Sequence, residues 1–271
     1  MRYLLIGLLS LSTTLWAQDY SGYLAQFDNR IYSLKSKNVK DFVVDVESSR
    51  LTKKVNDQTI FGKISKLSFR FYWTASPERL EIEVRGLPDG FREIKEDLKA
   101  NILVVMEDLI PLVLSQKFTG YKINSGSRPK EIVMQDSSGV ADIPIYILKF
   151  DSQDKLLEVE GKKPVGSLIV SPIYEKESFA DGKWVLTSMT MVNSDGFQTT
   201  TIKKELEYGN VQGIGVLEKI EIDTVIKREG SDAKPLISRE EIELSNYKIN
   251  TGEGLNYFLS EGSKPSDTAV P

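Results

Sequence analysis

The sequence predicts a mainly β protein of the α+β class, with a strongly curved antiparallel sheet or an incomplete β-barrel and two helices covering its concave face. Segments in which apolar and polar side chains alternate run through residues 40–85 and 145–246, which is typical of strands with one buried face. Two other stretches carry apolar residues three or four positions apart, which is typical of amphipathic helices. Turn signals separate about ten alternating segments, and a sheet of that size curls or closes.

The first residues have the layout of a secretory signal peptide, which we predict over residues 1–17. Arg2 supplies a positive charge, residues 4–15 are apolar or carry small or hydroxyl side chains, and Ala17 is a small residue at the end of the segment. An apolar run of about a dozen residues is too short for a stable span of the bilayer. We therefore expect a protein exported to the periplasm of a Gram-negative bacterium, with no stable membrane span after processing. The alternative is an N-terminal membrane helix.

Residues 18–258 are expected to form a single domain, because no second composition regime and no repeat of fixed period interrupts them. The domain begins with an amphipathic helix over residues 19–34. The alternating segments after it predict strands over residues 42–46, 67–73, 80–84, 145–147, 157–159, 165–170, 185–191, 200–206, 220–226 and 242–246.

A central helix over residues 89–118 is predicted between the third and fourth of these strands. Pro88 and Gly120 are stop signals at its two ends, and Pro111 is expected to kink or interrupt its second half. The linker that follows, which is rich in Gly, Ser, Lys and Pro, holds one short strand at residues 131–135. The polar, proline-containing residues 259–271 are predicted to be a disordered tail.

The composition excludes much enzyme chemistry. The chain of 271 residues contains no His and no Cys. A Ser-His-Asp triad, a His or Cys zinc site, an iron–sulfur cluster, thiol catalysis and disulfides are therefore all excluded. The net charge of −4 provides no overall attraction to nucleic acid. We expect a protein that is not an enzyme, with no cofactor and no metal site.

The apolar faces of the first three strands and of the central helix are the candidate ligand-binding cavity. Large side chains on adjacent strands need a covering partner, and the helix offers one. They either seal a core or leave space for an acyl chain. Met residues on a later strand suit an adaptable apolar site, or are plain core. The candidate residues are Phe42, Val44, Val46, Leu67, Phe69, Phe71, Trp73, Leu80, Ile82, Val84, Leu98, Ile102, Val105, Met106, Leu109, Met189 and Met191.

Pairs of carboxylates raise the alternative of a carboxylate-dependent hydrolase. Glu81 and Glu83, and likewise Glu241 and Glu243, lie two apart on the polar face of their strands, and residues 151–154 form a turn with an Asp at each end. Acid–base catalysis needs two carboxyls across a cleft, one of them with a raised pKa. Solvated strand charges that discourage edge pairing are the preferred interpretation.

The second half of the chain contains the stretches Gly182–Val192, Thr200–Tyr208, Val211–Gly213, Glu218–Ile222 and Glu243–Asn250. Together they resemble the outer-membrane lipoprotein-sorting (LolA/LolB-like) superfamily. The order of the elements carries most of the resemblance, over residues 19–250. It implies an incomplete barrel with a helical lid, whose apolar cavity holds the acyl chains of lipoproteins or other lipids.

The sequence thus predicts a periplasmic, non-catalytic carrier that binds a lipid or a lipidated protein between the sheet and a helical lid. It is expected to be a monomer that binds no nucleic acid and has an envelope protein as a possible partner. The alternatives are a periplasmic scaffold or sensor of the same fold that binds a protein segment, and the carboxylate-dependent hydrolase.

Overall fold

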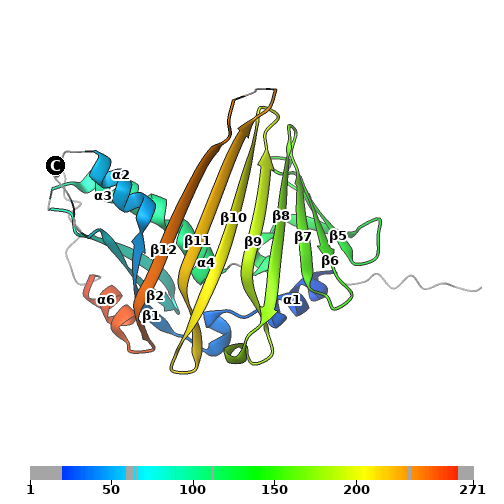
Figure 1. Ribbon diagram of the computed structural model, residues 1–271. Helices are drawn as coiled ribbons and strands as arrows, with labels where there is room; N and C mark the ends of the chain where they lie inside the picture. Colours follow the sequence, from blue (N-terminus) through cyan, green and yellow to red (C-terminus); the bar gives the residue numbers. More distant parts are fainter. Residues whose placement is uncertain are drawn as a thin grey trace, which may run out of the picture.

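The computed structural model describes residues 20–58, 64, 66–88, 90–111, 113–230 and 233–261. Within these residues the fold is mainly β: twelve antiparallel strands form one strongly curved sheet that does not close into a barrel (Figure 1). The predicted signal peptide over residues 1–17 lies outside the described part of the chain.

The strands follow the chain in the order β1 (Asp41–Ser48), β2 (Ser68–Ala75), β3 (Glu78–Arg85), β4 (Tyr121–Ser125), β5 (Glu131–Asp136), β6 (Ile145–Phe150), β7 (Leu156–Lys162), β8 (Ser167–Lys176), β9 (Trp184–Ser194), β10 (Gln198–Val211), β11 (Ile214–Arg228) and β12 (Leu236–Ile249). The helical segments are α1 (Tyr20–Arg30), η1 (Leu34–Lys37), α2 (Ser49–Asp57), α3 (Arg92–Ile102), η2 (Leu103–Val105), α4 (Met106–Leu109), α5 (Leu114–Lys117), η3 (Ser178–Ala180) and α6 (Glu253–Glu261).

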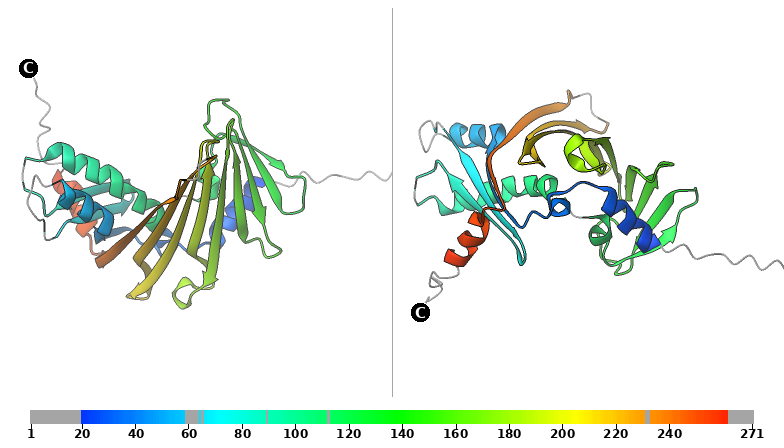
Figure 2. Two further views of the ribbon diagram at one scale, coloured as in Figure 1. Left: turned by 45° about the horizontal axis from the view of Figure 1, so that its top comes forward. Right: turned by 90° about the horizontal axis from the view of Figure 1, so that it is seen from below.

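The order of strands across the sheet is β3-β2-β1-β12-β11-β10-β9-β8-β7-β6-β5-β4. The last strand of the chain therefore pairs with the first, and β4 to β12 form a meander between one edge and that junction. The sheet bends into an open arch, with α1 and the segment from α3 to α4 on the concave side (Figure 2). We call this side the inner face.

The helix predicted over residues 19–34 is shorter than expected. Helix α1 ends at Arg30, because the next residues turn to meet the sheet: Ile31 forms a β-bridge with Trp184, and the Tyr32 amide donates to the Trp184 carbonyl at 2.8 Å. The chain then makes the short helix η1. Its Ser33 and Ser36 side chains hold each other's backbone amides in a capping box.

Helix α2 was not predicted. The Ser48 hydroxyl accepts a hydrogen bond from the Leu51 amide at 3.1 Å and so caps the helix where β1 ends. Only Leu51 and Val55, four positions apart, are buried in its nine residues. Two apolar side chains in an otherwise polar stretch are too weak a signal for a sequence-based assignment.

The prediction of a single central helix over residues 89–118 is wrong, because several short helical segments occupy this range. Helix α3 ends at Ile102, a single 3₁₀ turn and the four-residue α4 follow, and the backbone leaves the helical conformation at Ile110 before α5 begins at Leu114. Pro111 accounts for the break, because its ring excludes the helical conformation at the residue before it and it has no amide to donate.

The meander agrees with the predicted alternation, and each segment predicted as a strand lies within a strand or overlaps one. The linker after the central segment holds the predicted strand at residues 131–135 as β5, and it also holds β4, which was not predicted. The sheet therefore has twelve strands, where about ten were expected.

Helix α6 lies on the outer face of the sheet and was not predicted. The ring of Tyr257 stacks on that of Tyr72 in β2, with the ring centroids 3.9 Å apart. Asp41 accepts hydrogen bonds from the amides of Gly252 and Gly254 at the start of this helix. The helix extends to Glu261, so residues 259–261 of the predicted disordered tail are helical. Residues 262–271 lie outside the described chain.

Two large hydrophobic clusters lie on the inner face. The larger one packs α2, α3 and Leu109 of α4 against β1–β3 and β10–β12, and the smaller one packs α1 and Phe118 against β5–β7. A third, small cluster around Tyr32, Ala180 and Val185 lies between α1 and the start of β9. The inner face is therefore covered in two places, on either side of the middle of the sheet.

Candidate functional site

The structure brings most of the predicted cavity residues together, and it closes them into the larger core. Thirteen of them are buried members of this cluster: Phe42, Val44, Val46, Leu67, Phe69, Phe71, Trp73, Ile82, Val84, Leu98, Ile102, Val105 and Leu109. Leu80 and Met106 are partly buried against it. The packing favours the interpretation of these residues as a sealed core.

Met189 and Met191 lie elsewhere, on the inner face of β9. Met191 pairs with Val170 of β8 and with Ile202 of β10, while Met189 pairs with Lys204. Both Met residues are half-buried and neither belongs to the three hydrophobic clusters of the described residues. They are thus part of an apolar strip of sheet that is not fully covered.

A cavity of about 110 Å³, partly open to solvent, lies between the two cores on the inner face. One wall is the chain from α1 to η1, the second is the segment from α4 to α5, and the third is the sheet from β8 to β11. Its lining includes Phe27, Ile31, Leu34, Leu109, Pro111, Val113, Leu114, Tyr174, Leu186, Tyr208 and Leu217. Of the predicted cavity residues, Leu109 is the one in this lining.

The helical walls are held in place by a carboxylate. Asp28, near the end of α1, accepts hydrogen bonds from the backbone amides of Leu114 and Ser115 at 2.7 and 3.0 Å. These amides begin α5 and have no partner within that helix. These two hydrogen bonds tie α5 to α1 beside the cavity. The chain therefore has a fixed position on this side of the cavity despite the break at Pro111.

Three tyrosines place polar groups in the apolar lining. The Tyr32 hydroxyl donates to the carbonyl of Gly215 at 2.8 Å, and burial raises the pKa of Tyr32 to about 12. Burial also raises the pKa values of Tyr174 and Tyr208, and the nearby Asp108 carboxylate adds to the effect at Tyr208. All three are therefore neutral hydroxyls at physiological pH.

An ion pair lies beside the same cavity. The Lys204 ammonium of β10 donates to Asp108 Oδ2 of α4 at 2.7 Å, and the two side chains are only 11% and 7% exposed. Burial raises the pKa of Asp108, and the attraction of Lys204 opposes that rise. This pair was not predicted from the sequence. The available signal was a lysine in the inward row Thr200, Ile202, Lys204 and Leu206.

Most of the carboxylates considered for a hydrolase have structural partners. Glu81 accepts from Lys99 at 3.1 Å, Glu241 lies 3.2 Å from Lys219, and Asp151 accepts from the Gln153 and Lys155 amides of its own turn. Glu83 accepts from Arg85 at 2.7 Å and from the Tyr72 hydroxyl at 3.0 Å. These contacts support the interpretation of solvated strand charges.

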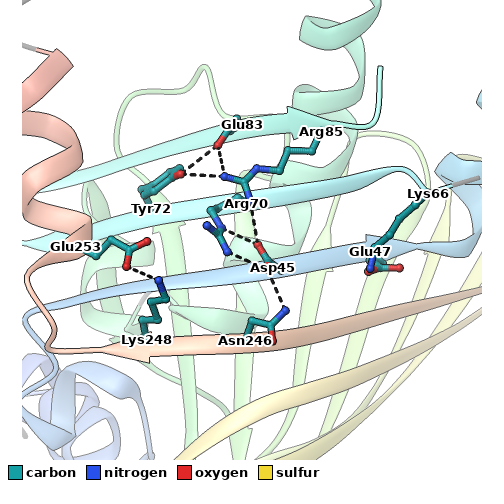
Figure 3. Close-up of polar contacts among 10 residues, drawn as sticks. All are labelled: Asp45, Glu47, Lys66, Arg70, Tyr72, Glu83, Arg85, Asn246, Lys248 and Glu253. Atoms are coloured by element: carbon teal, nitrogen blue, oxygen red, sulfur yellow. Dashed lines mark hydrogen bonds and ion pairs between the residues drawn. The ribbon is translucent and has the colours of Figure 1, made fainter. Parts of the chain in front are cut away.

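Glu83 belongs to a polar network on the outer face of β1–β3 and β12 (Figure 3). At its centre, Arg70 makes a two-point contact with Asp45 at 2.7 and 3.0 Å, and Asn246 donates to the same carboxylate at 3.0 Å. The network joins four strands on the face opposite the core. Its charged and polar groups bind one another, which is typical of a network that stabilises the fold.

The described residues contain no group of three or more Asp or Glu side chains placed to hold a metal ion. They also contain no helix with the length and hydropathy needed to cross a bilayer.

Compared with known proteins, the chain matches no family model, no curated protein and no solved structure.

Proposed function

We propose that the protein is a non-catalytic carrier in the periplasm that binds an acyl chain of a lipid or a lipidated protein on the inner face of its sheet. The observation that carries the proposal is the apolar cavity between α1, α4–α5 and strands β8–β11. An apolar lining with a few converging polar groups is the usual composition of a small-molecule site.

The chemistry of the lining indicates the class of ligand. Leucine, valine, isoleucine and aromatic side chains dominate it, and the tyrosines are neutral hydroxyls. An extended hydrocarbon gains roughly 25 cal/mol for each Å² of apolar surface that leaves water, without any catalytic group. The tyrosine hydroxyls suit the polar end of an amphiphile.

The inner face provides space for the rest of a long chain. Beyond the cavity, strands β8, β9 and β10 present Val170, Met191 and Ile202 side by side on the same face. These side chains are half-buried and lie outside the clusters of the core. A chain that enters at Leu186 would extend along this strip, and the flexible Met side chains would adapt to it.

The arrangement of the helices supports a lid as part of this proposal. The segment from α4 to α5 covers the cavity, and short contacts hold it: the Asp28 cap on α5 and the Lys204–Asp108 pair on α4. The LolA/LolB-like resemblance adds its element order, in which a central helical segment separates three strands from a meander that returns to them. The resemblance remains part of the proposal.

Binding of a dansyl-labelled fatty acid to the purified mature chain tests the proposal. Leu186→Trp would fill the cavity and is expected to weaken binding about tenfold or more, since each 1.4 kcal/mol of lost contact is one factor of ten. Ile173→Trp is the matched control, because Ile173 lies on neighbouring β8 and is 54% exposed. The control is expected to bind as the parent does.

Mass spectrometry of the protein purified from a periplasmic extract is the second measurement. Co-purifying acyl species are expected. Equal binding of the probe by Leu186→Trp, with both variants folded by circular dichroism, would contradict the cavity assignment. Co-purification of a single protein segment without lipid would replace the carrier by the scaffold alternative.

A further inference from the structure

One end of the sheet carries an unusual row of exposed apolar side chains. Val165 lies in the turn between β7 and β8, Phe197 in the turn between β9 and β10, and Leu236 and Ile237 at the start of β12. Their exposed fractions are 61%, 81%, 67% and 70%. In an antiparallel meander these connections lie at the same end, where the long strands project beyond the helices (Figure 1). We call this end the apical edge.

The apolar side chains of the apical edge lie on both faces of the sheet. Leu236 pairs with Ile226 and the adjacent Ile237 pairs with Val225, and neighbouring residues of a strand point to opposite faces. A protein groove would cover one face of such an edge. A medium that surrounds the edge on all sides, such as the interface of a lipid bilayer, removes the apolar side chains of both faces from water at once.

The backbone of the apical edge is already hydrogen-bonded, which entry into an apolar medium requires. The Asp195 carboxylate accepts from the amides of Phe197 and Gln198 at 2.9 and 2.8 Å, and the Glu229 amide donates to the Phe197 carbonyl at 2.8 Å. The Thr199 hydroxyl donates to Glu229 at 2.7 Å. These contacts tie the turn after β9 to the end of β11, so the exposed side chains are presented by a connected structure.

The apical edge is positively charged although the chain as a whole is acidic. The three connections, over residues 162–166, 194–198 and 227–237, contain five basic and three acidic residues, a net charge of +2 in a chain whose total is −4. Lys162, Lys227, Arg228 and Lys234 are exposed there. Basic side chains beside apolar ones suit a surface with anionic head groups above a hydrocarbon layer.

We infer that the apical edge docks onto an anionic lipid bilayer, with Phe197, Val165, Leu236 and Ile237 entering the interface and the basic residues contacting the head groups. The inference goes beyond the proposed function, because it assigns a surface and a partner distinct from the inner-face cavity. The strip of Val170, Met191 and Ile202 lies between that cavity and the apical edge, so a docked molecule would have its inner face open toward the lipid.

Co-sedimentation of the mature chain with vesicles tests the inference. The parent chain is expected to bind vesicles of phosphatidylethanolamine and phosphatidylglycerol, and to bind phosphatidylcholine vesicles about tenfold less, since the electrostatic attraction is lost. The double variant Phe197→Ser/Leu236→Ser is expected to lose binding to both about tenfold or more. The control Leu157→Ser/Ile173→Ser changes two side chains that are 47% and 54% exposed away from this edge, and is expected to bind as the parent does.

A second pair of variants separates charge from apolar contact. Lys227→Gln/Arg228→Gln is expected to reduce binding to the anionic vesicles alone, whereas Lys53→Gln/Lys54→Gln, with the same charge change on α2, is expected to have little effect. Sedimentation of the Phe197→Ser/Leu236→Ser variant equal to that of the parent would overturn the inference. So would a parent dimer in solution that this variant abolishes, since a second copy would then be the partner. Binding of the dansyl-labelled fatty acid without vesicles reports on the cavity and is expected to be unchanged in both edge variants.

Discussion

The Lys204–Asp108 pair shows how one contact can fix an element that propensity alone would not hold. Helix α4 has four residues, too few to be stable by itself, and the ion pair fastens it to the middle of the sheet. Both charges are largely removed from water, so each depends on the other. The pair therefore contributes more to the position of α4 on the sheet than to the free energy of unfolding.

The ion pair leads to a prediction on stability. Asp108→Asn leaves the Lys204 charge buried without its partner and is expected to lower the free energy of unfolding by about 3–5 kcal/mol. Asp108→Leu combined with Lys204→Met removes both charges, and is expected to be neutral or to stabilise by about 1–4 kcal/mol. Urea unfolding of the three proteins measures these differences. A double variant that loses as much stability as Asp108→Asn, or more, would contradict this account.

A second residue-scale prediction concerns acid. Burial acts to raise the pKa of Asp45, but the hydrogen bonds from Arg70 and Asn246 and the charge of Arg85 lower it below its ordinary value. The unfolded chain therefore takes up a proton at Asp45 before the folded chain does. The stabilisation by this carboxylate is present at neutral pH, and is lost as the pH falls from about 4 through the lowered pKa.

Replacing Asp45 should make that acid dependence visible. Asp45→Asn is expected to be less stable at neutral pH, and to show a shallower loss of stability below pH about 4 than the parent chain does. Urea midpoints measured across this pH range test the expectation. Asp57→Asn, which changes an exposed carboxyl at the end of α2, is the control. Parallel curves for Asp45→Asn and the parent would contradict the role of the network.

At the scale of elements, α3 illustrates the difference between a core helix and a removable plug. Leu98 and Ile102 are each 1% exposed and pack with side chains of β1–β3 and β12 in one cluster. Protein interiors packed in this way leave little space for a ligand. The part of the central segment that lies over a cavity is the later one, from α4 to α5.

Adjacent residues at the end of α3 provide a matched test. Ile102→Ala is expected to lower the free energy of unfolding by about 2–5 kcal/mol, since it leaves a cavity in the core. Leu103, the next residue, is 46% exposed, and Leu103→Ala is expected to change stability by less than about 0.5 kcal/mol. The folded Ile102→Ala protein is expected to bind the fatty-acid probe as the parent does. A large loss of affinity would instead indicate that the ligand binds beneath α3.

Alternation predicted the strands well, because one face of most of them is buried and the other is wet. It failed where an element is short or weakly patterned. Strand β4 has five residues, none of them fully buried, and α2 has two buried residues in nine. Pro111 was correctly expected to disturb the central helix. The extent of the break depends on tertiary contacts, such as the Asp28 cap on α5, which the local sequence does not reveal.

The candidate site was harder to predict than the strands. Apolar residues such as Phe69 and Ile102 were placed correctly between the strands and the helix, but apolar character does not distinguish a filled interior from an empty one. That difference depends on where a crossing segment lies on the sheet. The lining residues Tyr208 and Leu186 come from strands far along the chain from α1 and Pro111, and only the curvature of the sheet brings them together.

At the scale of the whole molecule, the two edge strands of the sheet differ in how many of their side chains are buried. Strand β3 has eight residues, contributes Ile82 and Val84 to the larger core and packs against α3. Strand β4 has five residues, none of them fully buried. Local opening is easiest where few apolar side chains are buried.

Hydrogen exchange followed by mass spectrometry can compare the two edges directly. Amides of Tyr121–Ser125 are expected to exchange faster than those of Glu78–Arg85 under native conditions, because less buried surface opposes the opening of β4. Both strands lie at an edge and pair with one neighbour, so pairing alone predicts equal rates. Slower exchange in β4 than in β3 would contradict this account of the two edges.

The pairing of β12 with β1 has a consequence for how the molecule is made. Phe42 lies opposite Ile249, so the junction between β1 and β12, inside the sheet, joins positions about two hundred residues apart. Until Leu236–Ile249 has been synthesised, β1 and β11 each expose an unpaired margin to whatever is nearby. Closing so long a loop is intrinsically slow. Unpaired strand margins of this kind favour aggregation, so a chain that is truncated before β12 is expected to aggregate.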